Sequence, residues 1–238
     1  MNEMIQLGEI SIAVSTKDIK NVHLTVHPPD GRVTLVAPIN TQLAVARAYA
    51  ISKLLWIREQ QRKLSSQARE TPRQFLERES HYVWGRRYLM KVELRDAKPS
   101  VVLSNKRINL TIRPGTSIEK RTEVMHEWHK SLLHEVVPSL IQKWERKLGI
   151  AVKGYFLQRM KTKWGSCNHL AGHIRLNTEL VKKPKDLLEY VIVHEMAHLI
   201  VPTHSDRFVA ILDEHYPSWR DARAELNELP LAAEVWRT

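Results

Sequence analysis

The segment 185–201 constrains this chain more than any other, because it forms a helical pattern with almost no polar face. Apolar residues recur on every side of it, which is typical of a helix buried in the centre of a domain. Within this apolar run stand three polar residues, His194, Glu195 and His198. Burying polar groups without partners is costly, so these side chains need hydrogen bonds or a functional site around them. Pro202 ends the helix.

The spacing of the two histidines predicts a metal site. His194 and His198 are four residues apart, so they lie one turn above each other and both imidazoles can reach one ion. Glu195 is rotated by about 100° from His194, which places its carboxylate beside the ion, where it can take a proton from bound water. This is the HExxH pattern of metal-dependent hydrolases. The alternative interpretation is a pair of histidines satisfied by ordinary hydrogen bonds.

A third ligand is expected just after the helix. A catalytic Zn²⁺ needs three protein ligands and an open position, and His204 follows the break at Pro202 closely enough to fold back onto the same ion. Acidic and histidine residues further downstream remain alternatives, either as ligands or as groups that orient a ligand: Asp206, Asp213, Glu214 and His215.

The rest of the chain reads as an α+β arrangement. Alternating apolar residues predict short strands in 5–39, with a turn at 28–31, and a second β stretch in 82–112. Residues 41–69 are predicted to form one long helix capped by Thr41, and 117–148 a second one, which Pro138 can kink or divide. A hairpin or meander is expected in 151–180, with Gly165 at a turn, and further helices in 185–201, 205–214 and 219–229. No internal repeat is visible.

The charge of the chain is strongly uneven. It holds 37 basic and 26 acidic residues, a formal net charge of +11. Residues 151–185 contain eight basic residues and one acidic residue, whereas 186–238 contain four and ten. A basic surface suits a polyanion, either nucleic acid or substrate phosphates, but it is also what a solvated lysine and arginine face looks like. None of the known nucleic-acid-binding signatures is present.

The cysteine count and the apolar runs bear on the compartment. Cys167 is the only cysteine, which excludes an intrachain disulfide framework and fits a reducing cytoplasm. No apolar run approaches the roughly 20 residues of a membrane span, and the first residues lack the features of a signal peptide. We therefore expect a cytoplasmic protein that does not bind membranes.

Three blocks of sequence resemble the YgjP-like family of zinc metallopeptidases, relatives of the SprT-like and WLM groups. The first is Lys161-Thr162-Lys163-Trp164-Gly165-Ser166-Cys167, and the second is the strand Ile174-Arg175-Leu176-Asn177. The third runs from Tyr190 to His198 and continues with His204, Ser205 and Phe208. The N-terminal strands and the helix around Trp56 fit as well, so the resemblance covers most of the chain.

The resemblance implies a zincin-like domain over 116–238, in which the buried HExxH helix packs on a small mixed sheet. Residues 1–115 then form an N-terminal β-rich region with a helix. His194, His198 and His204 are implied as the Zn²⁺ ligands and Glu195 as the catalytic base. A substrate-binding role is assigned to residues that could bind anionic oxygens or line the cleft: Arg159, Lys161, Lys163, Trp164, Arg175 and Asn177.

Three functions remain open from the sequence. A metallopeptidase would act on a peptide or protein, whereas a nucleoside triphosphate pyrophosphatase, an activity attributed within the family, would use the same site on phosphorus. A nucleic-acid-associated metalloprotein is the third. Cys167 lacks an evident base beside it, so it is a poor candidate for a nucleophile.

Overall fold

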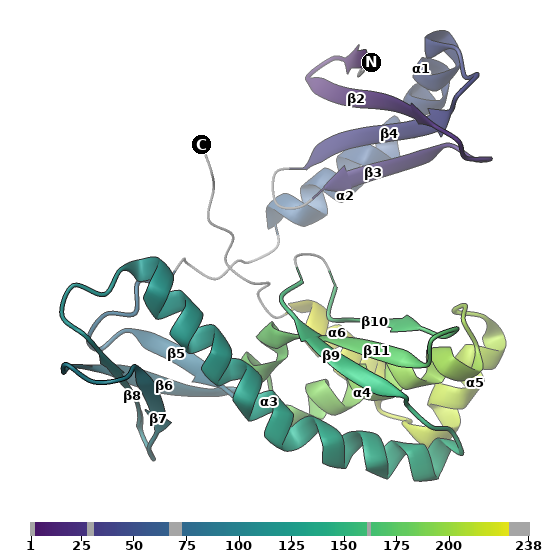
Figure 1. The fold of residues 1–238 in the computed structure, drawn as a ribbon. Helices are drawn as coiled ribbons and strands as arrows, with labels where there is room; N and C mark the ends of the chain where they lie inside the picture. Colours follow the sequence, from purple (N-terminus) through teal and green to yellow (C-terminus); the bar gives the residue numbers. More distant parts are fainter. Residues whose placement is uncertain (1–2, 28–30, 67–72, 161–162, 229–238) are drawn as a thin grey trace. The chain divides into compact units, whose positions relative to one another are not determined.

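The computed structural model describes residues 3–27, 31–66, 73–160 and 163–228. The chain forms two compact units, one up to residue 69 and one from residue 70 onward (Figure 1). The α+β class predicted from the sequence is confirmed, with three small sheets and seven helical segments in the described part. The division of the chain into an N-terminal region, 1–115, and a zincin-like domain, 116–238, remains a prediction.

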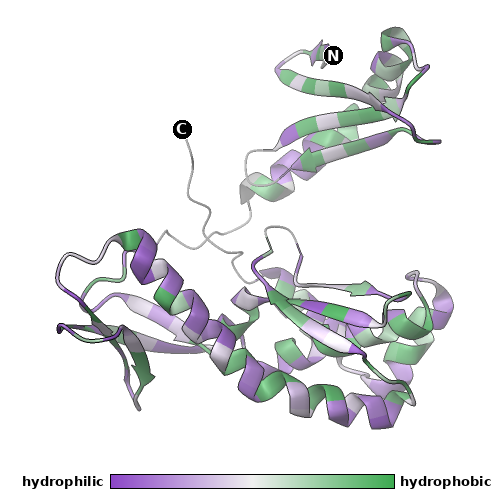
Figure 2. Ribbon diagram, in the orientation of Figure 1, coloured by the Kyte–Doolittle hydropathy of each residue, from purple (hydrophilic) through white to green (hydrophobic). Residues whose placement is uncertain are grey.

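The first unit is a four-stranded sheet with two helices. Its strands are β1 (Glu3–Leu7), β2 (Ile10–Lys17), β3 (His23–His27) and β4 (Arg32–Pro38), in the order β1-β2-β4-β3. Hydrophobic and hydrophilic residues alternate along these strands (Figure 2), so one face of the sheet forms the core. Most of the turn predicted at 28–31 lies outside the described residues, but Gly31 has the positive φ, 71°, that such a turn requires.

The single helix predicted for 41–69 is wrong in its continuity and in its cap. The structure has α1 (Leu43–Ser52) and α2 (Leu54–Ser66), and Gln42 rather than Thr41 precedes α1. The regular spacing fails at Lys53, whose N–H donates to the carbonyls of Tyr49 and Ala50 in a tightened turn. Periodicity alone does not reveal this irregularity, because the buried residues on either side of it keep a helical spacing.

The second unit begins with a sheet of the same strand order as the first. Its strands are β5 (Ser80–Val83), β6 (Arg86–Leu94), β7 (Ser100–Leu103) and β8 (Arg107–Ile112), in the order β5-β6-β8-β7. In both sheets the central pair is parallel and the two outer pairs are antiparallel. The sequence shows no internal repeat, yet the topology is repeated.

A long helix, α3 (Ile118–Leu148), connects this sheet to the rest of the second unit. Ser117 caps its start by accepting a hydrogen bond from the Lys120 N–H, and Gly149 ends it at φ 66°. The helix is continuous through Pro138. It runs past two sheets (Figure 1), and its buried residues form a stripe along most of its length: Met125, His129, Leu133, Val137, Ile141 and Trp144.

The C-terminal part contains the predicted helix on a small mixed sheet, and this expectation is confirmed. Strands β9 (Gly154–Gln158), β10 (Gly165–Asn168) and β11 (His173–Asn177) have the order β10-β11-β9, with one antiparallel and one parallel pair. A 3-10 helix, η1 (Thr178–Lys182), leads to α4 (Lys185–Ile200), which packs on β10 and β11. Around α4 lie α3, α5 (Asp206–His215) and α6 (Trp219–Glu228).

The central position of α4 explains its composition. Nine of its residues are buried, and its apolar side chains form the middle of the largest core of the molecule. No helix in the described ranges is both long and apolar enough to cross a bilayer.

Candidate metal centre

Three imidazoles converge where α4 ends. His194 and His198 come from the last two turns of α4, and His204 comes from the loop that leads to α5. The Nε2 atom of His204 lies 3.1 Å from Nε2 of His194 and 3.2 Å from Nε2 of His198. Tetrahedral zinc with Zn–N bonds of about 2.0–2.1 Å holds its nitrogens about 3.3 Å apart. The three side chains therefore fit one such ion.

Hydrogen bonds between neutral imidazoles do not account for both short contacts of His204. Nδ1 of His198 lies 3.2 Å from the carbonyl oxygen of Val201, which can only accept, so the proton of a neutral His198 sits on Nδ1 and Nε2 carries a lone pair. A single Nε2–H on His204 can serve only one of its two neighbours. Three nitrogens arranged in this way suit a metal cation held between them.

A buried phenylalanine supports all three rings. Phe208, on the first turn of α5, is 2% exposed, and its ring centroid lies 5.0 Å from that of His194, 4.5 Å from His198 and 4.9 Å from His204. In the sequence Phe208 stands out only as part of the third block that resembles the family. In the structure the Phe208 ring packs against all three imidazoles, which limits how these rings can rotate.

The surroundings of His194 and His198 favour their neutral forms. Burial, helped by the positive charges that His198 and His204 would carry, lowers the pKa of His194 to about 4. Burial also lowers the pKa of His198. Only a neutral imidazole offers a lone pair to a metal, so the cluster is prepared for a ligand role near neutral pH.

Glu195 lines the same cavity, which has a volume of about 520 Å³. Its side chain is nearly buried, and within the described part of the chain it has no hydrogen bond or ion pair. Burial raises the pKa of Glu195 to about 7, and the positive charge of Lys163 opposes that rise. A carboxyl group with a pKa near neutrality can both take and return a proton at physiological pH.

Gly165 gives Glu195 its space, a role that the sequence did not reveal. The residue was expected at a turn, but it lies in β10, opposite Leu176. A Cβ atom there would lie 2.6 Å from Oε1 and 2.7 Å from Cγ of Glu195. Only a hydrogen atom fits between the strand and the carboxylate. No spacing rule indicates this, although Gly165 belongs to a block that resembles the family.

Of the residues assigned to substrate binding, two line the cavity and three others that the structure describes do not. Lys163 and Trp164 form part of its wall. Asn177 is buried and donates to the backbone carbonyls of Met160 and Lys163, at 2.9 and 2.8 Å, so it holds the segment that carries Lys163. Lys161 lies outside the described residues.

The two arginines of that set lie elsewhere. Arg159 is 3.7 Å from the carboxylate of Glu179. Arg175 is exposed on β11 between two buried residues, so it points to the outer face of the sheet, and its guanidinium lies 5.8 Å from the centre of the Phe156 ring. Neither forms part of the cavity wall.

The other candidate ligands do not join the histidine cluster. Among the residues that the structure describes, the cluster of potential metal ligands consists of the three histidines alone. Asp213 pairs with Arg220, and His215 lies 3.8 Å from Glu214. Burial, together with the charge of Glu195, raises the pKa of Cys167 to about 11, which keeps its thiol protonated.

Two cavity residues were given no role from the sequence. Tyr190, the first residue of the third block that resembles the family, lies one turn before His194 on α4 and packs its ring edge-to-face against His194 at 5.8 Å between centroids. Arg223 enters the cavity wall from α6, far along the chain from the HExxH segment. Only the packing of α6 against α4 brings it there.

Comparisons with known proteins place this site in a family. Among curated protein sequences none matches the chain. Of solved structures, the zymogen of the metallopeptidase abylysin from Pyrococcus abyssi is 20% identical, covering 38% of this chain and 91% of its own, with a TM-score of 0.36. The zymogen of jannalysin from Methanocaldococcus jannaschii is 21% identical, covering 41% and 92%, with a TM-score of 0.30. The YgjP-like metallopeptidase domain matches residues 20–229, and the chain therefore belongs to the YgjP-like family.

Proposed function

We propose that the protein is a zinc-dependent peptidase in which His194, His198 and His204 hold the ion and Glu195 is the catalytic base. The observation that carries this proposal is the convergence of three Nε2 atoms at a cavity that His194, His204 and the buried Glu195 line, where the carboxylate has no partner among the described residues. Family membership supports metallopeptidase chemistry. A peptide or protein is accordingly the proposed substrate.

The proposed role of each side chain in the reaction follows from its surroundings. A zinc ion, when bound, supplies Lewis acidity, which lowers the pKa of a coordinated water and polarises a carbonyl. Val201 fixes the tautomer of His198, and Phe208 holds the three rings in place. Glu195 receives the proton of the attacking water on a carboxylate oxygen and later gives it to the leaving amine nitrogen. Trp164 and Phe208 keep part of the site apolar.

A second candidate function is the hydrolysis of a nucleoside triphosphate to the monophosphate and pyrophosphate. The observation that favours it is the presence of Lys163 in the cavity wall, because a lysine cation binds phosphate. A third candidate, association with nucleic acid, draws on the exposed cation Arg175 at the outer face of the sheet. Weak binding that is indifferent to salt would count against the third candidate.

The deciding experiment is a substrate panel on the full chain. Zinc-loaded protein is assayed with a quenched-fluorescent peptide library, casein and the four nucleoside triphosphates, each with and without a chelator. The peptidase proposal expects chelator-sensitive cleavage of peptides and metal content near one ion per chain. Chelator-sensitive release of pyrophosphate without any peptide cleavage would replace it by the second candidate.

A further inference from the structure

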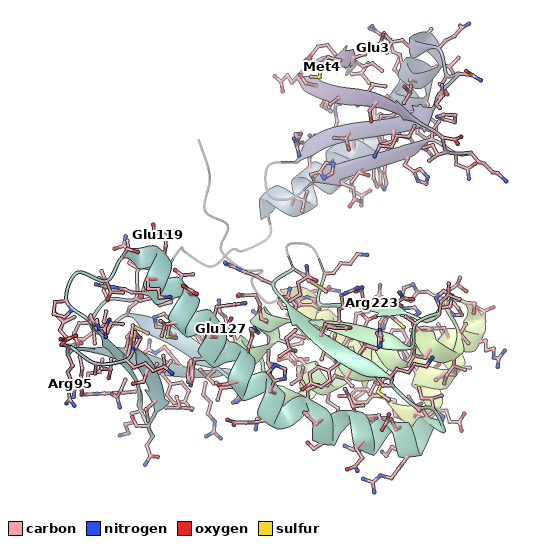
Figure 3. All side chains as sticks on the ribbon, viewed as in Figure 1. Glu3, Met4, Arg95, Glu119, Glu127 and Arg223 are labelled. Carbon is pink, nitrogen blue, oxygen red and sulfur yellow. The ribbon has the colours of Figure 1, made fainter. Side chains whose placement is uncertain are left out.

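The wall of the cavity beside the histidine cluster carries two cations. Lys163 comes from the segment before β10, and Arg223, labelled in Figure 3, comes from α6. Their charges reach different groups of the site. The charge of Lys163 acts on Glu195, whereas that of Arg223 acts on His194 and Tyr190. One cation therefore stands near the base and the other near the metal ligands.

Neither cation is neutralised within the part of the chain that the structure describes. No ion pair joins either side chain to a carboxylate there, although other arginines of this region are paired, such as Arg220 with Asp213. Among the described residues of the cavity wall, Glu195 is the single acidic side chain, set against the two cations Lys163 and Arg223. Cations therefore outnumber carboxylates in the cavity even before a metal dication enters. An anionic ligand would be attracted to it.

The remaining wall is mostly apolar. It consists of aromatic and aliphatic side chains from four elements or the segments beside them: Trp164, Val191, Phe208, Val209, Trp219 and Leu226. At about 520 Å³ the cavity is in the range of pockets that enclose a small organic ligand. A ligand that carries an anionic group next to an apolar one can bury the apolar part here if the anionic group meets a cation, because burying an unpaired charge is costly.

We propose that Arg223, together with Lys163, forms an anion subsite that selects substrates carrying a carboxylate or phosphate next to a large apolar or aromatic group. This inference rests on the proposed function, because it assigns the substrate class of the same cavity. Arg223 offers a planar fork of donors, which binds two oxygens of one carboxylate or phosphate at once. For a peptide, the fitting group is the free C-terminal carboxylate of a chain that ends in a large apolar residue.

Binding, measured separately from turnover, tests the subsite. Zinc-loaded Glu195→Gln protein is titrated calorimetrically with N-acetyl-phenylalanine, its neutral amide and phenyl phosphate. The titrations are repeated after adding Arg223→Gln, and after adding Arg207→Gln as a matched control, since Arg207 is an exposed arginine on α5. A carboxylate can also contact zinc directly, so the informative quantity is the change caused by Arg223→Gln.

The expected result is that Arg223→Gln weakens at least one of the two anions by roughly tenfold to a hundredfold, with little change for the amide. Arg207→Gln should leave all three affinities unchanged. Loss confined to the carboxylate identifies peptide C-termini as the source of the anion, and loss confined to phenyl phosphate identifies phosphates. Equal affinities with and without Arg223 for both anions would overturn the proposal. Because the readout is binding, this result stays distinct from a failure of the proposed peptidase activity, which the chelator panel detects.

Discussion

The second unit contains two groups in which a buried glutamate lies near histidine, and they differ in whether the glutamate has an ion pair. In the candidate site, Glu195 has no ion pair among the described residues, and burial raises its pKa to about 7. In the same unit, His129 of α3 lies near Glu179 of η1, which is as deeply buried as Glu195. There Lys182 approaches Glu179 to 2.6 Å and Arg159 to 3.7 Å.

The paired carboxylate behaves in the opposite way to the unpaired one. Burial alone would raise the pKa of Glu179, but the charges of Lys182 and Arg159 outweigh it and the pKa is lowered. Glu179 therefore stays ionised and holds neighbouring elements together, whereas Glu195 is poised to exchange a proton. The comparison indicates that burial alone does not mark a carboxylate as a candidate catalytic group, whereas burial without a partner among the described residues does.

The largest expected effect comes from removing the unpaired carboxylate. Glu195→Gln keeps the shape of the side chain and all three histidines but cannot accept the proton of water. We expect kcat to fall by roughly 10²–10⁴-fold, with zinc content unchanged by atomic emission. The free energy of unfolding of the metal-free protein should not decrease. Retained hydrolysis in this variant would remove Glu195 as the base.

The paired carboxylate should respond in stability instead. Glu179→Gln leaves Lys182 and Arg159 facing a neutral amide in a buried place, so we expect unfolding to become easier by on the order of 3 kcal/mol. Activity per folded molecule should persist. The control is Glu123→Gln, which breaks another lysine–glutamate pair of the same spacing, with Lys120, but on the surface. Its cost should stay below about 1 kcal/mol by urea denaturation, and equal costs for both variants would mean that burial does not matter here.

A third variant tests the space around the unpaired carboxylate. Gly165→Ala places a methyl group where the structure has less than 3.0 Å to Glu195, so the carboxylate must shift. A displacement of this size should lower kcat by roughly 100-fold while zinc stays bound. Ser166→Ala, the neighbouring position of β10, serves as the control and should retain activity. A fully active Gly165→Ala enzyme would show that Glu195 needs no fixed position.

The smallest effect concerns the pH dependence of stability. Burial, with the charge of Lys182, lowers the pKa of His129 to about 3, whereas an unfolded histidine titrates near 6.5. Between these values only the unfolded chain takes up the proton, so stability falls as the pH falls. The contribution of His129 approaches about 1.4 kcal/mol per pH unit. His129→Phe should flatten the slope measured by denaturation between pH 6.5 and 4; replacing the exposed His169 controls for the loss of an imidazole. An unchanged slope would contradict the buried, neutral state of His129.

The sequence predicts those parts of the site that depend on one helix. His194, Glu195 and His198 follow from a spacing within α4, and the apolar run around them identifies the helix as buried. Strands beneath it are expected from the hairpin or meander pattern of 151–180, whereas their arrangement as a small mixed sheet is implied by the resemblance to the family. The helix spacing and the strand pattern are local, so each can be read from neighbouring residues.

The rest depends on packing between distant segments. Arg223 reaches the cavity only because α6 returns to α4, and Gly165 matters only because β10 passes close to Glu195. Asn177 was expected at the substrate, yet it holds the backbone of the Lys163 segment. The turn at Lys53 could not be predicted from the sequence either, because the apolar residues on both sides of it keep a helical spacing. Such relations arise from tertiary contacts that no single window contains.

Two sheets of the same strand order in one chain create a hazard during folding. A strand can dock into the wrong sheet when adjacent modules share order and direction, and misassembly of this kind is a characteristic failure of repeated architectures. The inner faces of the two sheets differ in volume. β4 contributes Val33, Leu35 and Ala37, whereas β8 contributes Ile108, Leu110 and Ile112. An exchanged β4 would leave a void and an exchanged β8 would overfill the core, so the difference in side-chain volume favours each strand in its own sheet.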